Sequence, residues 1–229
     1  MITAENLSLS YGQGQAGCLA VNAVSMKVER GEFVMILGPS GSGKSSLLYL
    51  LSGLRSPSSG NVFYLGRDLS CMRASEVARM RYKCFGFIFQ QHFLVPYLTA
   101  VENVCMGRKD ALGYRARVLL HQLHLAGKEN ALPTELSYGQ RQRVAVARAL
   151  VHEPQVIFAD EPTASVDSEL ATEICDWLRH YCGAGHICIM ATHDSRLIKH
   201  ASTVYSIRDG HLGSATRFDD FPMTGPNSQ

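Results

Sequence analysis

The clearest chemistry lies in a glycine-rich run, Gly38-Pro39-Ser40-Gly41-Ser42-Gly43-Lys44-Ser45, which fits the pattern G-x-x-x-x-G-K-[ST]. Glycines allow successive backbone N–H groups to curl around phosphate oxygens. A helix that begins at the end of the run would add its free N–H groups and its dipole. The pattern predicts phosphate binding; a plain glycine-rich turn between a strand and a helix is the alternative.

Within this loop we expect Lys44 to bridge the β- and γ-phosphates of a nucleotide and the Ser45 hydroxyl to bind Mg2+. Both roles follow from the place of the two residues at the end of the motif. The residues expected to bind the nucleotide here are Gly38, Pro39, Ser40, Gly41, Ser42, Gly43, Lys44, Ser45 and Ser46.

A pair of carboxylates follows a second apolar run. Val156–Ala159 is wholly apolar, and Asp160 and Glu161 come directly after it. Because α/β sheets bind their ligands at the carboxyl ends of strands, both side chains are candidates for the same site. We expect Asp160 to hold magnesium, through water, and Glu161 to polarise the attacking water. A helix cap or a solvated turn is the alternative.

The pattern of apolar residues predicts the elements that position these groups. Phe33–Leu37 resembles a buried strand of a parallel sheet, and helical spacing follows over Lys44–Leu54. Strand patterns dominate the first ninety residues and return, alternating with helices, after Pro154. Between them the strand signals vanish, and a long Ala/Val/Arg helix is expected over Gln140–Val151. Asp209-Gly210 predicts a hairpin turn near the end of the chain.

We therefore predict a single α/β domain over residues 1–229. Residues 1–90 and 153–215 would form the core together with an N-terminal antiparallel β subdomain. Residues 91–152 would form an inserted α-helical subdomain, and residues 216–229 a loose C-terminal tail.

Composition excludes several classes of protein. Charged residues make up only 18% of the 229 residues, against about 25% in an average domain. The net charge of +2 predicts no nucleic-acid partner. The apolar runs are too short for a membrane span, and the N-terminus does not resemble a signal peptide. The seven cysteines form no C-x-x-C pair and predict free thiols, so we expect a cytosolic globular protein.

Further motifs occur in the order of one known family. Leu136-Ser137-Tyr138-Gly139-Gln140 resembles the LSGGQ signature of ATP-binding cassette (ABC) ATPases, and Gln140 lies 20 residues (160 − 140) before Asp160. Phe89-Gln90 resembles that family's Q-loop, and Ala164-Ser165-Val166-Asp167 resembles its D-loop. Ala191-Thr192-His193-Asp194 resembles the segment with its switch histidine, and Tyr11 occupies the place of its adenine-stacking aromatic. The chain is identified as a member of this family over about residues 2–215, which implies a RecA-like P-loop NTPase fold.

The resemblance implies that ATP binds with Mg2+ between two copies of the chain arranged head to tail. Ser137, Gly139 and Gln140 would contact the γ-phosphate held by the partner's loop, because their helix start lies too far from the loop of their own subunit. ATP would hold the dimer closed and hydrolysis would release it. Tyr11 would stack on the adenine, although it could equally be an ordinary strand aromatic.

The resemblance also implies the catalytic groups. Gln90 would bind the metal and sense the attacking water, and His193 would contact the γ-phosphate and position Glu161. Expected catalytic residues are thus Glu161, His193, Gln90 and Lys44, and expected metal ligands are Ser45, Gln90 and Asp160.

The sequence departs from the family's pattern in three places. Tyr138 replaces the first glycine of the signature pair, where a bulky phenol could alter closure or ATP turnover. Ala164-Ser165-Val166-Asp167 replaces the commoner S-A-L-D or G-N-L-D of the D-loop. The stretch from Met106 to Arg115 is shorter than the corresponding helix of many relatives.

Residues Phe85–Val104 and Leu69–Arg81 are similar to ATPases of the lipoprotein-releasing, macrolide-efflux and glycolipid-export group. This implies separate membrane permease subunits as partners, a location on the cytoplasmic side of the cell membrane, and export or extraction of a lipophilic substrate, a lipoprotein or a drug. The alternative is a non-transporting ATPase whose membrane partner regulates cell-wall enzymes.

Three further interpretations concern the surface. Phe93–Tyr97 could be core of the helical insertion or a groove for a permease helix. His180-x-Cys182 and His186-x-Cys188 hold atoms that could bind zinc, but no fitting fourth ligand is evident. The low charged fraction predicts uncharged faces near residues 38–45, 89–98 and 137–140, covered by the second copy and by the permease.

Overall fold

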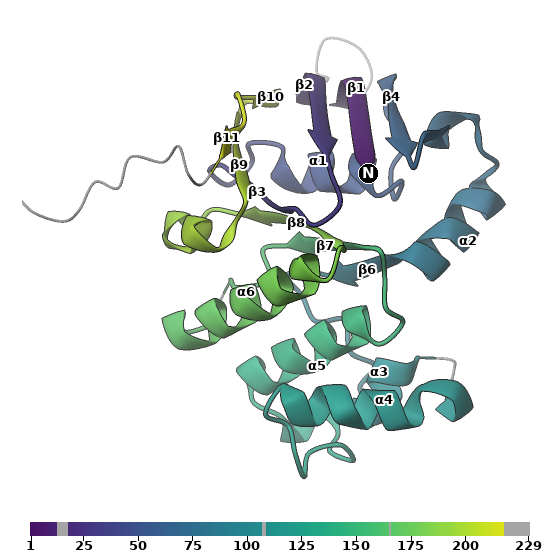
Figure 1. The fold of residues 1–229 in the computed structure, drawn as a ribbon, viewed down its shortest axis with the longest axis vertical. Helices are drawn as coiled ribbons and strands as arrows, with labels where there is room; N and C mark the ends of the chain where they lie inside the picture. The colour runs from purple at the N-terminus through teal and green to yellow at the C-terminus, as the bar shows by residue number, and fades with distance from the viewer. Residues whose placement is uncertain (13–17, 107–108, 165, 218–229) are drawn as a thin grey trace, which may run out of the picture.

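The computed structural model describes residues 1–12, 18–106, 109–164 and 166–217, without the side chains of residues 109–112. A mainly parallel sheet with the strand order β10-β9-β3-β8-β7-β6 crosses the centre of the molecule (Figure 1). Its strands are β3 (Phe33–Leu37), β6 (Phe85–Ile88), β7 (Val156–Asp160), β8 (Ile187–Thr192), β9 (Thr203–Arg208) and β10 (His211–Leu212). All pairs among β3 and β6–β9 are parallel.

The central strands are apolar because both faces of this sheet are covered. Every residue of β7 and of β8 is buried. On one face the sheet packs against α1 (Lys44–Leu51), whose four leucines share one core with residues of β3, β7 and β8. On the other face α5 (Tyr138–Leu150) and α6 (Ser168–Gly183) contribute to a second core (Figure 1).

A second, antiparallel sheet lies beyond α1 and has the order β2-β1-β4-β5. It is formed by β1 (Ile2–Tyr11), β2 (Cys18–Val28), β4 (Ser59–Tyr64) and β5 (Arg67–Asp68). Buried residues of β1 and β2 join the core that contains the α1 leucines, so α1 is packed between the two sheets. The P-loop α/β fold with an antiparallel β part, expected from the sequence, is confirmed.

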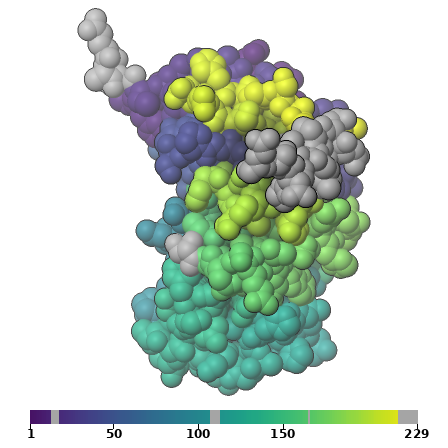
Figure 2. Space-filling model, turned by 90° about the vertical axis from the view of Figure 1, so that its left-hand side faces the viewer, coloured from purple at the N-terminus to yellow at the C-terminus, as the bar shows by residue number. Residues whose placement is uncertain are grey.

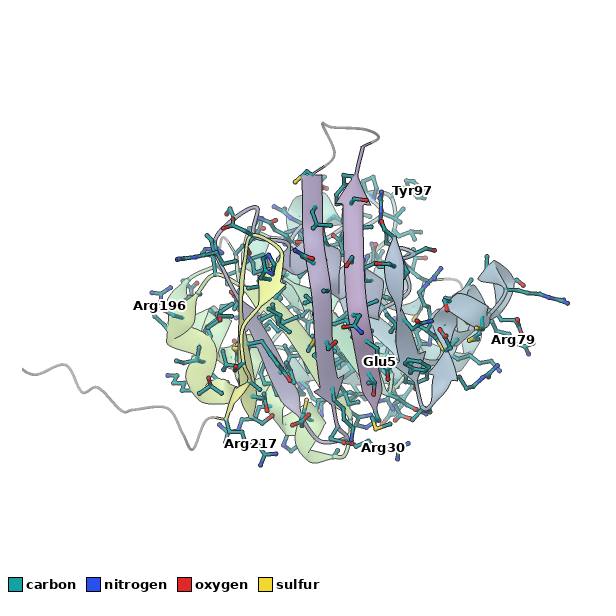
Figure 3. All side chains as sticks on the ribbon, turned by 90° about the horizontal axis from the view of Figure 1, so that it is seen from above. Glu5, Arg30, Arg79, Tyr97, Arg196 and Arg217 are labelled. Atoms are coloured by element: carbon teal, nitrogen blue, oxygen red, sulfur yellow. The ribbon has the colours of Figure 1, made fainter. Side chains whose placement is uncertain are left out.

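The remaining helices lie on two sides of the sheets. Below the central sheet in Figure 1, α3 (Ala100–Cys105) and α4 (Lys109–Gln122) pack with α5, and Figure 2 shows these residues as one continuous lower part. The basic helix α2 (Ala74–Cys84) flanks the sheets, and its Arg79 points away from them, as do Arg196 and Arg217 (Figure 3). In the part of the chain described, no helix is long and apolar enough to cross a membrane.

Several predicted boundaries differ from the structure. Helix α1 ends at Leu51 instead of Leu54, because Gly53 adopts a left-handed conformation with φ +63°. Thr216 and Arg217, which we expected in a loose tail, form the short strand β11 (Thr216–Arg217) and pair with β9. The rest of the expected tail, residues 218–229, lies outside the described residues.

Two glycines permit a matched test of this packing. A Cβ on Gly86 in β6 would lie 2.5 Å from the Ala149 carbonyl oxygen and 2.9 Å from Pro154 Cγ, whereas one on Gly113 in α4 would have no neighbour within 4 Å. We expect Gly86→Ala to lower the free energy of unfolding by about 1–3 kcal/mol through overpacking. Gly113→Ala should raise it by about 0.5–1 kcal/mol, because alanine favours helix. Urea unfolding of both variants measures the difference, and equal stabilities would contradict this account.

Candidate active site

The glycine-rich loop connects the carboxyl end of β3 to the start of α1. Gly43 directly precedes α1 with φ +104°, a conformation that favours glycine. A Cβ at Gly43 would lie 2.1 Å from the carbonyl oxygen of Ala20, and one at Gly38 would lie 2.4 Å from that of Ile207. Both positions therefore exclude a side chain, and the loop has the strand–loop–helix setting that phosphate binding requires.

Lys44 is held inside this loop. Its Nζ donates hydrogen bonds to the carbonyl oxygens of Gly38 at 2.9 Å and Pro39 at 3.0 Å. The same Nζ lies 3.3 Å from Oε1 of Glu161, and the two side chains are only 6% and 12% exposed. A buried ammonium group thus lies between the glycine-rich loop and the carboxylate at the end of β7.

The metal-binding candidates meet directly. Ser45 Oγ donates to Asp160 Oδ1 at 2.8 Å, and Tyr49 Oη donates to Asp160 Oδ2 at 3.0 Å. A serine hydroxyl and a carboxylate are oxygen ligands of the kind that Mg2+ prefers, so this pair fits the ion. Burial, followed by the charge of Asp160, raises the pKa of Tyr49 to about 12. Sequence reasoning missed Tyr49, although its place four residues after Ser45 puts both on one helix face.

Glu161 and His193 form a second pair at the same edge of the sheet. Oε2 of Glu161 lies 2.9 Å from Nδ1 of His193. The Glu161 backbone has φ +48°, and its N–H donates to the carbonyl oxygen of Ala191 in β8. Because β7 and β8 run parallel, the residues that follow them emerge side by side.

Other predicted residues lie at the rim of this site. Tyr11 Oη is 3.2 Å from Ser46 Oγ, next to the loop, and the Arg55 guanidinium lies 4.6 Å from the centre of the Tyr11 ring. One face of Tyr11 is therefore covered by a cation, which the sequence did not indicate. Gln90 follows β6 and is exposed; among the described residues its side chain makes no hydrogen bond.

The signature residues begin α5 and do not contact the glycine-rich loop of their own chain within the described part of the structure. Ser137 Oγ accepts from the Gln140 N–H at 3.2 Å, and Gln140 Oε1 accepts from the Ser137 N–H at 2.9 Å, which is a capping box. Ser137 is exposed, and Gly139 and Gln140 are partly so. The buried Gln142 amide, further along α5, donates to the Pro162 carbonyl oxygen beside Glu161.

The remaining motifs are only partly described. In the expected D-loop, Ser165 lies outside the described residues, while Asp167 caps α6 by accepting from the Leu170 N–H at 2.8 Å. His180, Cys182, His186 and Cys188 hold atoms that could bind zinc. Within the described part of the chain, no group of three or more His, Cys, Asp or Glu is placed to hold a metal ion.

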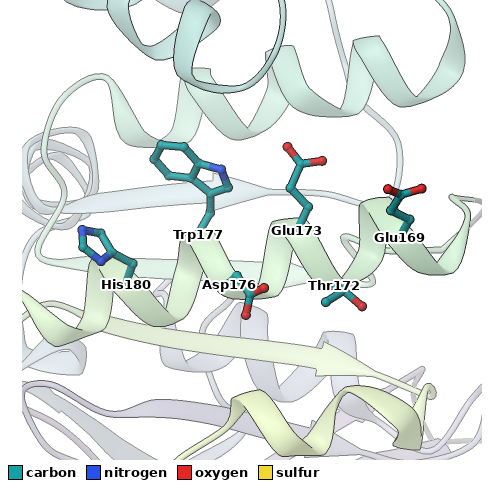
Figure 4. A pocket seen from close by; sticks show the side chains of 6 residues that line it. All are labelled: Glu169, Thr172, Glu173, Asp176, Trp177 and His180. Atoms are coloured by element: carbon teal, nitrogen blue, oxygen red, sulfur yellow. The ribbon is translucent and has the colours of Figure 1, made fainter.

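A separate hollow of about 440 Å³ lies along α6 (Figure 4). Its lining residues are Glu169, Thr172, Glu173, Asp176, Trp177 and His180. Glu173 pairs with Arg143 and with His124, and Asp176 with His200. These contacts account for two of its carboxylates.

The family model of the ABC transporter matches residues 21–164. The chain belongs to this family. It is 44% identical to an uncharacterised ABC transporter ATP-binding protein of Methanocaldococcus jannaschii, over 93% of this chain and 97% of that protein. It is 38% identical to the macrolide export ATP-binding/permease protein MacB of Sodalis glossinidius, over 99% of this chain but only 36% of that protein.

Solved structures agree with this assignment. An ATP-binding cassette captured as a dimer in a post-hydrolysis state, bound to ADP and Pi, has a TM-score of 0.87 and 32% identity, and covers 95% of this chain and 98% of its own. A nucleotide-free cassette from an ABC transporter, at 24% identity and a TM-score of 0.83, shares the fold. The chain is the ATP-binding subunit of an ABC transporter and an ATPase.

Tyr49 offers a test of how Asp160 is held. Tyr49→Phe removes one of the two hydroxyl groups that donate to the carboxylate of Asp160, which is only 6% exposed. We therefore expect the free energy of unfolding to fall by about 1–2 kcal/mol. Tyr114→Phe is the matched control, because Tyr114 is 86% exposed. Urea unfolding without nucleotide measures both, and a Tyr49→Phe protein as stable as the control would contradict the role of this hydrogen bond.

Proposed function

We propose that two copies of this chain bind two ATP molecules head to tail and that ATP hydrolysis drives a separate membrane permease. One observation carries the proposal: Lys44, Ser45, Asp160, Glu161 and His193 meet at one edge of the sheet, while the signature residues are exposed elsewhere in the same chain. A site that needs both sets of groups requires a second copy.

The geometry supports a role for each residue of the first set. The loop N–H groups and Lys44 bind the β- and γ-phosphates, and Ser45 and Asp160 would hold Mg2+, which would supply positive charge beside the phosphate oxygens. Glu161 accepts a proton from the attacking water, because its carboxylate lies 3.3 Å from Lys44 Nζ and so faces the expected position of the γ-phosphate. His193 holds the other carboxylate oxygen, and Gln90, which follows β6, would bind the metal and sense the attacking water.

The signature supplies the second set. Ser137 is the N-cap of a helix of 13 residues, and the positive end of the helix dipole lies at this exposed start, which favours an anion. Ser137, Gly139 and the Gln140 amide would contact the γ-phosphate in the partner's loop. The dimeric form of the related cassette bound to ADP and Pi supports this arrangement. Tyr11 would stack on the adenine with the ring face that Arg55 leaves open.

An uncharged surface supports a permease partner. Phe93 is 62% and Tyr97 is 78% exposed, while Leu94 between them packs against the core, which favours a docking surface over a buried insertion core. Residues 89–98 and 137–140 contain no Asp, Glu, Lys or Arg, and residues 38–45 contain only the buried Lys44. Few charges in these three segments support their coverage by the second copy and the permease.

The proposed location is the cytoplasmic side of the cell membrane, held there through the permease. The relatives named for macrolide export favour export of a lipophilic compound. The chain spans about a third of the length of those relatives, 34–36%, so the permease part and its substrate lie outside the comparison.

Two substitutions separate ATP binding from hydrolysis. We expect Glu161→Gln to bind ATP, to lose at least about 100-fold in hydrolysis because the general base is gone, and to accumulate ATP-bound dimers. Lys44→Ala should instead lose nucleotide affinity. ATPase assays, fluorescent-nucleotide titration and size-exclusion chromatography with ATP and Mg2+ check the three properties.

The matched controls are Glu169→Gln, an exposed carboxylate of α6, and Lys27→Ala, an exposed lysine of β2. Both should behave like the unchanged protein. Unchanged turnover in Glu161→Gln would refute its catalytic role, and unchanged affinity in Lys44→Ala would refute phosphate binding by the loop.

A pull-down tests the permease. Tagged protein mixed with detergent-solubilised membranes from its own source should retain an integral membrane protein. Tyr97→Glu should release that protein, because burying a charged carboxylate in an apolar contact costs binding free energy. Leu65→Glu, at another exposed apolar residue, should retain it. A retained permease that carries cell-wall enzymes would favour the alternative function, and retention of no membrane protein would refute the partner.

A further inference from the structure

Tyr138, the residue that departs from the signature pattern, contacts the segment after Gln90. The ring of Tyr138 meets the ring of His92 edge to face, with centroids 4.4 Å apart and an interplanar angle of 67°. Tyr138 is the first residue of α5 and lies between Ser137 and Gly139. A glycine at this position would have no side chain with which to make the contact.

Arg148, further along α5, holds the same segment from a second point. Its guanidinium donates to the backbone carbonyl oxygen of His92 at 2.5 Å and to that of Phe93 at 2.8 Å. Residues 92 and 93 are therefore attached to α5 both by a ring contact at its start and by a guanidinium ten residues later (148 − 138). The segment and α5 must move together or both attachments must break.

The attached segment is in a strained arrangement. Phe93 adopts φ +46°, which is unfavourable for a bulky residue. Its side chain is 62% exposed and meets the ring of Phe89 edge to face, with centroids 5.6 Å apart. The Nε2 atom of His92 is buried without a hydrogen-bond partner among the described residues. Such strain is retained where the surroundings impose it, and here α5 imposes it.

We propose that Tyr138 is a positioning residue that couples the two ATP sites of the dimer through its contact with His92. This rests on the proposed function, in which Gln90 serves the ATP of its own subunit and Ser137 and Gly139 serve the ATP of the partner. ATP that engages Gln90 orders the segment from residue 90 to residue 93. The ring contact then orders the start of α5, so the partner's ATP meets signature residues that are already in place.

Removal of either ring tests this coupling. Full-length Tyr138→Ser and His92→Ala should each raise the ATP concentration for half-maximal dimerisation about two- to tenfold, the range expected from one aromatic pair. Dimerisation is measured by size exclusion in the Glu161→Gln background. ATP hydrolysis is measured in the two variants with Glu161 left unchanged, and its Hill coefficient should fall toward 1.

Three comparisons distinguish coupling from a structural effect. The double variant Tyr138→Ser/His92→Ala should equal either single variant, because the two rings act as one unit. Tyr138→Phe keeps the ring, so its Hill coefficient should equal that of the wild-type protein. Tyr114→Ser, at an exposed tyrosine of α4, should change neither measurement, and circular dichroism confirms that all variants are folded.

The outcomes separate this proposal from the proposed function. A wild-type protein that neither hydrolyses ATP nor dimerises with it refutes the function itself. Three outcomes would overturn the coupling alone. They are a Hill coefficient of 1 for ATP hydrolysis by the wild-type protein, unchanged cooperativity in Tyr138→Ser, and additive effects in the double variant.

Discussion

Parallel pairing within the central sheet is the constraint on which the site depends. β3 pairs with β8 and β8 with β7, in a register that sets Leu37 opposite Thr192 and Asp160 opposite Ala191. Three loops therefore begin at one edge, and each carries a different kind of group: a lysine with glycines, a pair of carboxylates, and a histidine. A one-residue shift of β7 would turn Asp160 to the other face of the sheet.

The apolar run before each loop explains why much of this arrangement was predictable. Val156–Ala159 and Phe33–Leu37 are short and apolar throughout, so the sequence indicated buried parallel strands and placed Lys44 and Asp160 at their ends. The strand–loop–helix order then followed from the glycines. The α/β fold class was predicted in this way, whereas the family was predicted from the resemblance of its ordered motifs, and both are confirmed.

Contacts between distant segments could not be predicted, because no local pattern encodes them. Arg55 covers Tyr11 and Gln142 reaches Pro162 only after several elements have packed, and neither residue belongs to a motif. The strand pairing of Thr216 with Val204 was missed for a similar reason, since two residues are too few to show a period. The roles assigned to the individual site residues, from Lys44 and Glu161 to Gln90, Tyr11 and the signature residues, stay predictions.

The hydrogen bond from Gln142 to Pro162 attaches α5 to the segment that follows Glu161. Gln142 is 2% exposed and lies five residues from Ser137 (142 − 137), which is about 7.5 Å along the helix at 1.5 Å of rise per residue. Moving α5 away from this segment would leave a buried amide without its partner, which costs about 1–3 kcal/mol. The helix that begins with the signature residues is therefore tied, within its own chain, to the residue next to Glu161.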